Sequence, residues 1–163
     1  MEDRALVHGV VQSINVSAGG LPKHPVPEAD VTPDGLVGDQ HADTEHHGGP
    51  DRAVCIYSLE RIEALRAEGH TLAPGHVGEN LTVSGIDWEA IRPGVRLAVG
   101  DVLLEVTRFT TPCHKIEASF ADGRSDRISH KLHPGWSRVY ARVLEPGVVR
   151  VGDLAIVLPS RLD

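Results

Sequence analysis

Short apolar runs, separated by clusters of glycine and proline, dominate the pattern of this chain of 163 residues. Alternating or continuous apolar runs of four to eight residues are typical of β-strands. Strands are predicted at 5–16, 53–57, 80–83, 95–99, 102–107, 139–144 and 154–158. Gly9 predicts a bulge within the first strand, and the Gly-Asp pairs at 100–101 and 152–153 predict turns.

One segment has helical spacing instead. Leu59, Ile62 and Leu65 follow Ser58, which is a good N-cap, and Gly69 predicts the end of this helix. Short helices are expected around 116–120 and 126–132, a loop at 17–33, and a polar segment outside the core at 35–49. The pattern therefore predicts one mainly β, barrel-like domain over 1–163, with its core at about 5–158 and a few peripheral helices.

The composition is consistent with a mainly β domain and argues against some classes of function. Gly 17, Pro 11 and 20 valines suit a sheet-rich chain with many turns. Lys+Arg 16 against Asp+Glu 23 gives a net charge of −7, which argues against a nucleic-acid binder. No apolar run is long enough for a membrane span, and the start of the chain lacks a signal-peptide pattern. Two cysteines make no disulfide framework, so a cytoplasmic protein with reduced thiols is expected.

The segment 38–53 holds the densest polar chemistry of the chain. Its histidines, among them His46 and His47, and its carboxylates are residue types that ligate metals, although their spacing matches no common zinc motif. Gly48 and Gly49 leave backbone N–H groups open to close approach by an anion. A solvated loop whose side chains cap turns is the alternative, and the residue pattern leaves both open.

Cys113 and Cys55 occupy different settings. Pro112 is expected to end the preceding strand and to place Cys113 in a loop, where His114 and Lys115 favour the thiolate. A thiolate is a soft metal ligand and a nucleophile or sulfur carrier. The alternative for Cys113 is a small buried apolar residue. Cys55 lies within an apolar run and is interpreted as an inert core thiol.

Two further groups are candidates for ligand contacts. Glu79 and Asn80 follow Gly78 at the start of a predicted strand, where they either face a ligand or close a turn. Arginine suits bidentate phosphate recognition, and Arg52 and Arg138 flank the segments described above.

Taken together, these segments resemble the MOSC domain family, which is named from the C-terminal part of molybdenum-cofactor sulfurases. The matching pieces occur in the family order and cover roughly 5–158. They are Gly38-Asp39, His46-His47-Gly48-Gly49, Gly78-Glu79-Asn80-Leu81-Thr82, Gly100-Asp101, Pro112-Cys113 with Lys115, Arg142-Val143-Leu144-Glu145-Pro146-Gly147 and Gly152-Asp153. The family often shows Pro-Arg before its Thr-Pro-Cys sequence, whereas here Phe109 and Thr110 separate Arg108 from Thr111-Pro112-Cys113. Because the arginine is displaced, it is not assigned a phosphate contact.

The resemblance implies a pyruvate-kinase-like β-barrel that binds molybdenum cofactor, with Cys113 as the molybdenum ligand. The chain is similar to the small stand-alone bacterial members of the family, which detoxify N-hydroxylated purines. Catalytic roles then fall on Cys113, His46 and His47, with the histidines supplying protons. The implied cofactor-binding residues are Gly48, Gly49, Glu79, Asn80, Lys115 and Arg52. Pyridoxal phosphate is not expected, because it belongs to a separate domain of the full sulfurases.

Three functions follow as hypotheses. The first is a molybdenum-dependent reductase of N-hydroxylated small molecules, which needs a separate electron-donor reductase. The second is a non-enzymatic carrier that delivers molybdenum cofactor, or persulfide sulfur on Cys113, to an acceptor enzyme. The third is a zinc or other metal hydrolase built on the histidine-rich segment. None of the three requires nucleic acid or a membrane as a partner.

Overall fold

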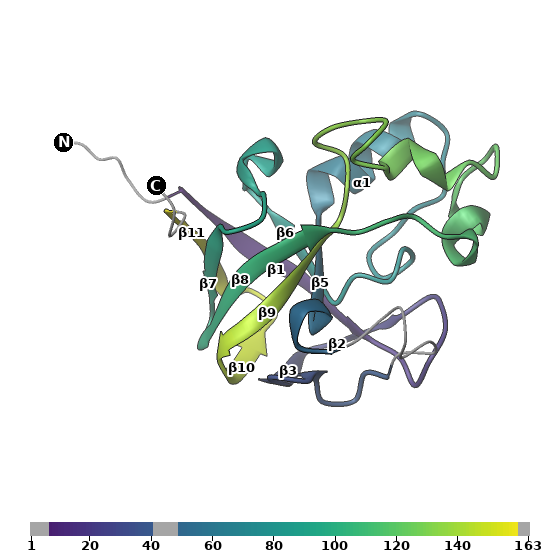
Figure 1. Cartoon of the computed structure of the whole chain (residues 1–163). Coiled ribbons are helices and arrows are strands. Elements are labelled where there is room, and N and C mark those ends of the chain that lie inside the picture. The colour runs from purple at the N-terminus through teal and green to yellow at the C-terminus, as the bar shows by residue number, and fades with distance from the viewer. Residues whose placement is uncertain (1–6, 41–48, 160–163) are drawn as a thin grey trace.

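A closed β-barrel of seven strands forms the centre of the molecule (Figure 1). The computed structural model describes residues 7–40 and 49–159. Around the barrel the strands follow the order β11, β7, β8, β9, β5, β6, β1, and pairing of β11 with β1 closes it. Among the strand pairs within these described residues, only β5–β6 is parallel. The barrel strands are β1 (Val7–Val16), β5 (Val54–Ser58), β6 (Leu81–Ser84), β7 (Arg96–Val99), β8 (Val102–Phe109), β9 (Val139–Glu145) and β11 (Leu154–Leu158). The prediction of a mainly β barrel is confirmed.

Strand β1 is long enough to pair with three neighbours. Val10 lies opposite both Leu154 of β11 and Ser84 of β6, and the far end of β1 pairs with β2 (His24–Val26). The register of β1 against β6 shifts between Val11 and Ser13, so the bulge lies after Gly9 and not at it. Gly9 has another role: a Cβ atom there would meet the Ser84 carbonyl oxygen at 1.9 Å, so only glycine permits this close approach.

A second, three-stranded sheet was not predicted from the sequence. It contains β3 (Glu28–Thr32), β4 (Gly35–Leu36) and β10 (Gly147–Arg150), in the order β10-β3-β4. The prolines of 17–33 indicated a loop, but proline is tolerated at strand ends and sheet edges. Val31 in the expected loop is buried, and Leu36 is buried too, so part of the segment 35–49 that was expected outside the core belongs to it.

The helices lie outside the barrel, as predicted. Helix α1 (Leu59–Ala67) begins where the Ser58 hydroxyl accepts a hydrogen bond from the Arg61 N–H at 3.2 Å, and Ile62 and Leu65 are its buried residues. The other described helices are short 3₁₀ turns, η1 (Pro50–Arg52), η2 (Trp88–Ala90), η3 (His114–Ser119) and η4 (Ser125–Ile128). No helix within the described ranges is long and apolar enough to cross a membrane.

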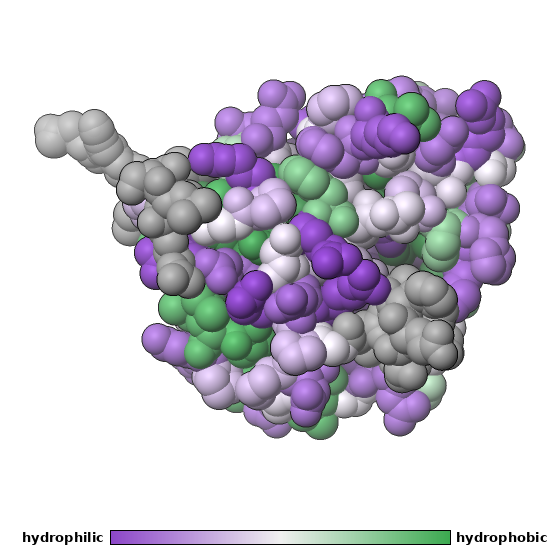
Figure 2. Space-filling view, viewed as in Figure 1, coloured by the Kyte–Doolittle hydropathy of each residue, from purple (hydrophilic) through white to green (hydrophobic). Residues whose placement is uncertain are grey.

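The surface is mostly polar on the face shown in Figure 2. Hydrophobic residues gather there over the strand ends where β8, β9 and β10 lie in Figure 1. The long excursion between β8 and β9, which carries η3 and η4, extends away from the barrel (Figure 1). This excursion supplies several of the residues described next.

Candidate functional site

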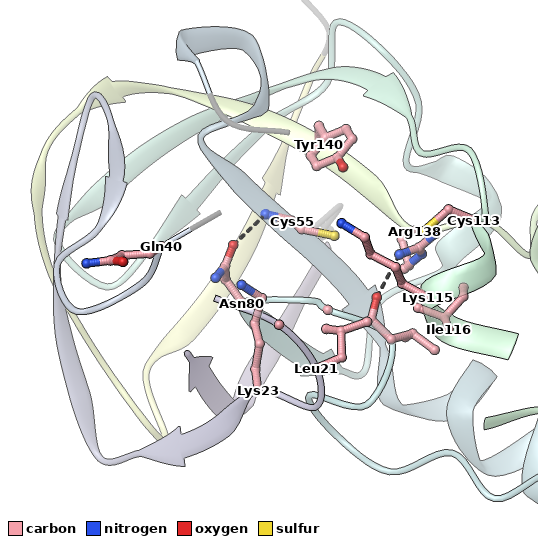
Figure 3. A pocket seen from close by; sticks show the side chains of 13 residues that line it. Leu21, Lys23, Gln40, Cys55, Asn80, Cys113, Lys115, Ile116, Arg138 and Tyr140 are labelled. Carbon is pink, nitrogen blue, oxygen red and sulfur yellow. Dashed lines mark hydrogen bonds between the residues drawn. The ribbon is translucent and has the colours of Figure 1, made fainter. Parts of the chain in front are cut away.

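A pocket of about 80 Å³ lies against the wall formed by β5 and β9 (Figure 3). Segments distant in the sequence meet there, because Cys113 and Lys115 come from the excursion after β8 and Asn80 comes from the start of β6. Three predicted site residues are therefore brought together. A volume of this size holds a few waters or one small group, so a larger ligand would place only one end in it.

Cys113 lies in a loop at the pocket, as predicted. Backbone pairing beyond β8 continues to Thr110, whose N–H donates to the Arg138 carbonyl oxygen at 3.0 Å. Cys113 then precedes η3, and its carbonyl oxygen accepts from the Ile116 N–H and the Ser125 hydroxyl at 3.3 and 3.4 Å. The backbone is thus held while the thiol is free of a disulfide and half-buried. A reagent or ligand can reach this sulfur.

Cys55 lines the same pocket, which its apolar sequence did not indicate. Cys55 of β5 lies directly opposite Tyr140 of β9. Their neighbours Val54, Ile56 and Val139 are fully buried in the core. Because side chains alternate along a strand, Cys55 and Tyr140 face the other side, and Figure 3 shows the Cys55 sulfur pointing into the pocket.

Both groups keep their protons at neutral pH. Burial raises the pKa of the Cys55 thiol to about 11, and the nearby Arg138 charge offsets part of that effect. Burial also raises the pKa of the Tyr140 hydroxyl to about 12. A thiol that keeps its proton is a poor nucleophile, so the inertness of Cys55 stays a prediction, although its sulfur faces the pocket.

Asn80 connects the pocket wall to a buried ion pair. Its side-chain oxygen accepts from the Cys55 N–H at 2.9 Å, and its amide nitrogen donates to Asp39 at 2.9 Å. The Lys23 ammonium group also donates to both Asp39 oxygens, at 2.7 and 2.9 Å. The exposed fractions of these two side chains are only 8% and 3%. The Asp39 carboxylate therefore neutralises the Lys23 ammonium group. The unbalanced positive charge at the pocket comes from other side chains.

Arg138 is the most unusual cation of the site. It is 6% exposed, and its Nη1 donates to the Val77 carbonyl oxygen at 2.6 Å. Its buried Nε has no hydrogen-bond partner among residues 7–40 and 49–159. Lys115 points into the same pocket (Figure 3), and none of the described residues that line it is Asp or Glu. An anionic group would satisfy this arrangement.

Glu79 and Arg52 do not line the pocket. Gly78 and Asn80 on either side of Glu79 line the pocket, whereas Glu79 itself is completely buried. Its Oε2 accepts from the Gly75 N–H and the Thr82 hydroxyl, both at 3.0 Å. Complete burial raises the pKa of the Glu79 carboxyl.

The structure describes only part of the polar segment 38–53, which contains Gly48 and Gly49. The guanidinium carbon of Arg52 lies 5.9 Å from the centre of the Tyr140 ring. Arg52 is the last residue of η1, and Gly49 is the residue just before this helix. Gly49 is exposed with a φ of 82° and does not line the pocket. The predictions for His46, His47 and Gly48 fall outside the described residues. Within those residues, no group of three or more His, Cys, Asp and Glu could hold a metal ion.

Sequence reasoning missed Lys23, Tyr140 and the pocket-facing position of Cys55. Arg138 was noted only as a flanking residue, although it is a buried cation that lines the pocket, as Lys23 is. The sequence carried only an indirect signal for these residues. Arg138 and Tyr140 are the sequence neighbours of Val139, the first residue of the predicted strand 139–144. Without the pairing of β5 with β9, nothing in the sequence places that strand beside Cys55.

Known structures share this fold. YiiM from Geobacillus stearothermophilus superposes with a TM-score of 0.70 at 25% sequence identity, over 93% of this chain and 75% of that one. The YuaD protein of Bacillus subtilis gives a TM-score of 0.75 at 19% identity, over 94% of this chain and 97% of that one, which supports the fold alone.

Curated relatives extend the comparison. YflK of Bacillus subtilis (strain 168) is 32% identical over 135 residues, 82% of this chain and 60% of its own length. YiiM of Escherichia coli (strain K12) is 31% identical, over 79% of this chain and 58% of its length. A protein named "Reductase" from Gibberella moniliformis is 34% identical, over 76% of this chain and 22% of its length. The chain thus spans about three fifths or less of these relatives.

The family model confirms the resemblance drawn from the motifs. The MOSC domain model matches residues 43–155, which include Asn80, Cys113, Lys115, Arg138 and Tyr140 of the pocket. The protein belongs to the MOSC domain family.

Proposed function

We propose that this protein binds molybdenum cofactor at the Cys113 pocket and reduces N-hydroxylated small molecules. The observation that carries the proposal is the pairing of a half-buried, free thiol with the cationic side chains of Lys115 and Arg138 in one pocket. Molybdenum cofactor has two parts that complement these groups. Its metal accepts a soft thiolate ligand, and its phosphate is an anion that cationic side chains bind. Membership of the MOSC family supports this pairing.

The residues present fit such a group. The buried Nε of Arg138 lacks a partner among the described residues, and a buried guanidinium favours an anion in contact with it. The pocket of about 80 Å³ is too small for a whole pterin cofactor, so one end of the cofactor would enter and the rest would lie along the mouth.

The chain's own residues then have separate tasks. Cys113 is the thiolate ligand, and Lys115 and Arg138 bind the anionic part. The cofactor, when bound, supplies the two-electron chemistry. Asn80 fixes the β5 backbone behind the site through its bond to the Cys55 N–H, and Glu79 supports the turn at Gly75 from behind. Tyr140 keeps its proton at neutral pH and is a hydrogen-bond donor at the pocket.

Reduction of an N–OH group also requires protons. His46 and His47 are the proposed sources, because imidazole titrates near neutral pH. Electrons come from a separate reductase in this proposal, and the setting is cytoplasmic. The printed name of the Gibberella moniliformis relative, "Reductase", supports this reaction class, although the match covers 22% of that protein.

A carrier of cofactor or persulfide on Cys113 is the second candidate, because the half-buried sulfur is accessible for transfer. Turnover separates the two. Cofactor-loaded protein is mixed with an N-hydroxylated purine and an artificial one-electron reductant, and the amine product is quantified. A reductase forms product in many cycles, and Cys113→Ser abolishes it while Cys55→Ala does not. A loaded protein that forms no product, yet transfers its cofactor to an apo-enzyme, is a carrier.

A further inference from the structure

Arg138 enters the cysteine pocket from a stretch of irregular backbone just before β9. Residues 136–138 belong to no strand or helix, so their carbonyl oxygens have no regular partner in secondary structure. A buried carbonyl oxygen without a hydrogen bond is costly, so the donors for this stretch have to come from elsewhere in the fold. These donors determine where the backbone of Arg138 lies.

Two buried aromatic side chains hold the two residues before Arg138. The Tyr57 hydroxyl of β5 donates to the Trp136 carbonyl oxygen at 2.6 Å. The Trp88 indole N–H of η2 donates to the next carbonyl oxygen, that of Ser137, at 2.8 Å. The Tyr57 and Trp88 rings pack edge-on, with a centroid distance of 6.0 Å, and both residues are buried. Burial raises the pKa of the Tyr57 hydroxyl, so at neutral pH this group keeps the proton that it donates.

The residues on either side of this pair are held as well. The Arg61 Nε atom of α1 donates to the Gly135 carbonyl oxygen at 2.9 Å, and the Arg61 guanidinium carbon lies 4.5 Å from the centre of the Trp136 ring. The Arg138 carbonyl oxygen accepts from the Thr110 N–H at 3.0 Å. Four successive carbonyl oxygens are thus bound by donors from four different parts of the chain, which leaves the backbone of Arg138 little freedom.

The position of this backbone decides where the guanidinium group lies. An arginine side chain has several rotatable bonds, and its planar fork binds an oxyanion well only when it faces the anion. The Arg138 Nη1 atom is already bound to the Val77 carbonyl oxygen at 2.6 Å, and the residue lines the pocket. A backbone shift of about 1 Å would break this bond or turn the fork away from the pocket.

We propose that Tyr57 and Trp88 are positioning residues for anion binding, because they hold the backbone of Arg138 so that its guanidinium group faces the pocket. Neither of the two lines the pocket itself, so they act through Arg138. This role rests on the proposed function, in which Arg138 binds the anionic part of the cofactor. It adds two buried donors to the residues on which that binding depends.

Tyr57→Phe and Trp88→Phe test this role, because each removes one donor and keeps an aromatic ring. Val99→Ala is the matched control, since it truncates a buried residue of β7, a strand that supplies no residue to the pocket. Titration calorimetry at constant ionic strength measures the dissociation constant of inorganic phosphate. NMR of arginine side chains measures the Nε–H resonance of Arg138, which is assigned by its absence in Arg138→Met. Circular dichroism verifies that each variant is folded, and either aromatic variant suffices for the test.

Tyr57→Phe and Trp88→Phe should each weaken phosphate binding at least fivefold and shift or broaden the Arg138 resonance. Val99→Ala should lower the midpoint of urea unfolding and leave both measurements unchanged. Equal phosphate affinity, or an unchanged Arg138 resonance, in a folded aromatic variant overturns the positioning role alone. Equal weakening in Val99→Ala overturns it too, because binding then follows general stability. Wild-type protein that binds no phosphate overturns the anion-binding role of Arg138, and the positioning role with it.

Discussion

Asn80 holds Cys55 by both of its backbone polar groups. The Asn80 side-chain oxygen accepts from the Cys55 N–H at 2.9 Å, and the Asn80 backbone N–H donates to the Cys55 carbonyl oxygen at 2.7 Å. Asn80 is 1% exposed and Cys55 is 6% exposed, so water cannot replace either bond. This contact locks β5 against the start of β6, and through the strand pairing it also fixes Tyr140 at the pocket.

Asn80→Ala should therefore destabilise the fold by about 2–3 kcal/mol, because it leaves the buried Cys55 N–H without its acceptor and removes the amide hydrogen bond to Asp39, which keeps only Lys23 on that oxygen. Urea denaturation measures the free energy of unfolding. The control is Gln12→Ala, which removes an exposed hydrogen bond to Ser84 and should cost less than about 0.5 kcal/mol. Equal losses in the two variants would contradict the role given to Asn80.

The two cysteines should differ sharply in alkylation. With a pKa of about 11, roughly one Cys55 thiol in a thousand is ionised at pH 8, and the side chain is buried. Cys113 is half-buried and free, so iodoacetamide should modify it first in the native protein. Peptide mapping after timed quenching gives both rates. Faster labelling of Cys55 would reverse the assignment.

The sequence predicted the strands and the helix start that depend on neighbouring residues, and it missed strands that depend on contacts between distant residues. Short apolar runs predicted β5 and β11, and Ser58 predicted the start of α1, because each depends on neighbouring residues. Strands β3 and β10 were missed because their pairing joins residues more than a hundred positions apart. No local pattern reports such a contact.

The same distinction between local and distant contacts applies to the residues of the site. Pro112 predicted the loop position of Cys113, and the structure places Lys115 and Asn80 beside it. Glu79 was grouped with Asn80 as a ligand contact, but its carboxylate is bonded to Gly75 and Thr82 and is buried, so only Asn80 lines the pocket. Lys23 and Arg138 join the site through barrel closure, which residue types alone do not reveal.

Glu79 should make stability fall as the pH rises. Its pKa is raised in the folded protein, so the folded state binds more protons than the unfolded state above pH 4.5, the ordinary value. Stability contributed by the protonated carboxyl is full below that pH and is lost towards the folded pKa. Glu79→Gln cannot ionise, so its free energy of unfolding should decline less between pH 4.5 and pH 7. Parallel pH profiles for wild type and variant would refute the prediction.

Arg138 should bind inorganic phosphate. At a phosphate concentration ten times the dissociation constant, wild-type protein should gain about 1.4 kcal/mol of stability. Arg138→Met should lose this gain, because it removes a buried guanidinium that lines the pocket, and Arg66→Met on the exposed part of α1 should keep it. Thermal unfolding with and without phosphate, at constant ionic strength, makes the comparison. A gain retained in Arg138→Met would exclude Arg138 as the anion-binding residue.

The molybdenum and pterin content of protein purified from a host that synthesises molybdenum cofactor tests the central claim most directly. Elemental analysis and pterin fluorescence are measured together on wild type, Cys113→Ser and Cys55→Ala. We predict nearly equimolar molybdenum and pterin in wild type and in Cys55→Ala, and at least tenfold less molybdenum in Cys113→Ser. Wild-type protein without pterin, or Cys113→Ser with the molybdenum content of wild type, would contradict the assignment of Cys113 as the molybdenum ligand.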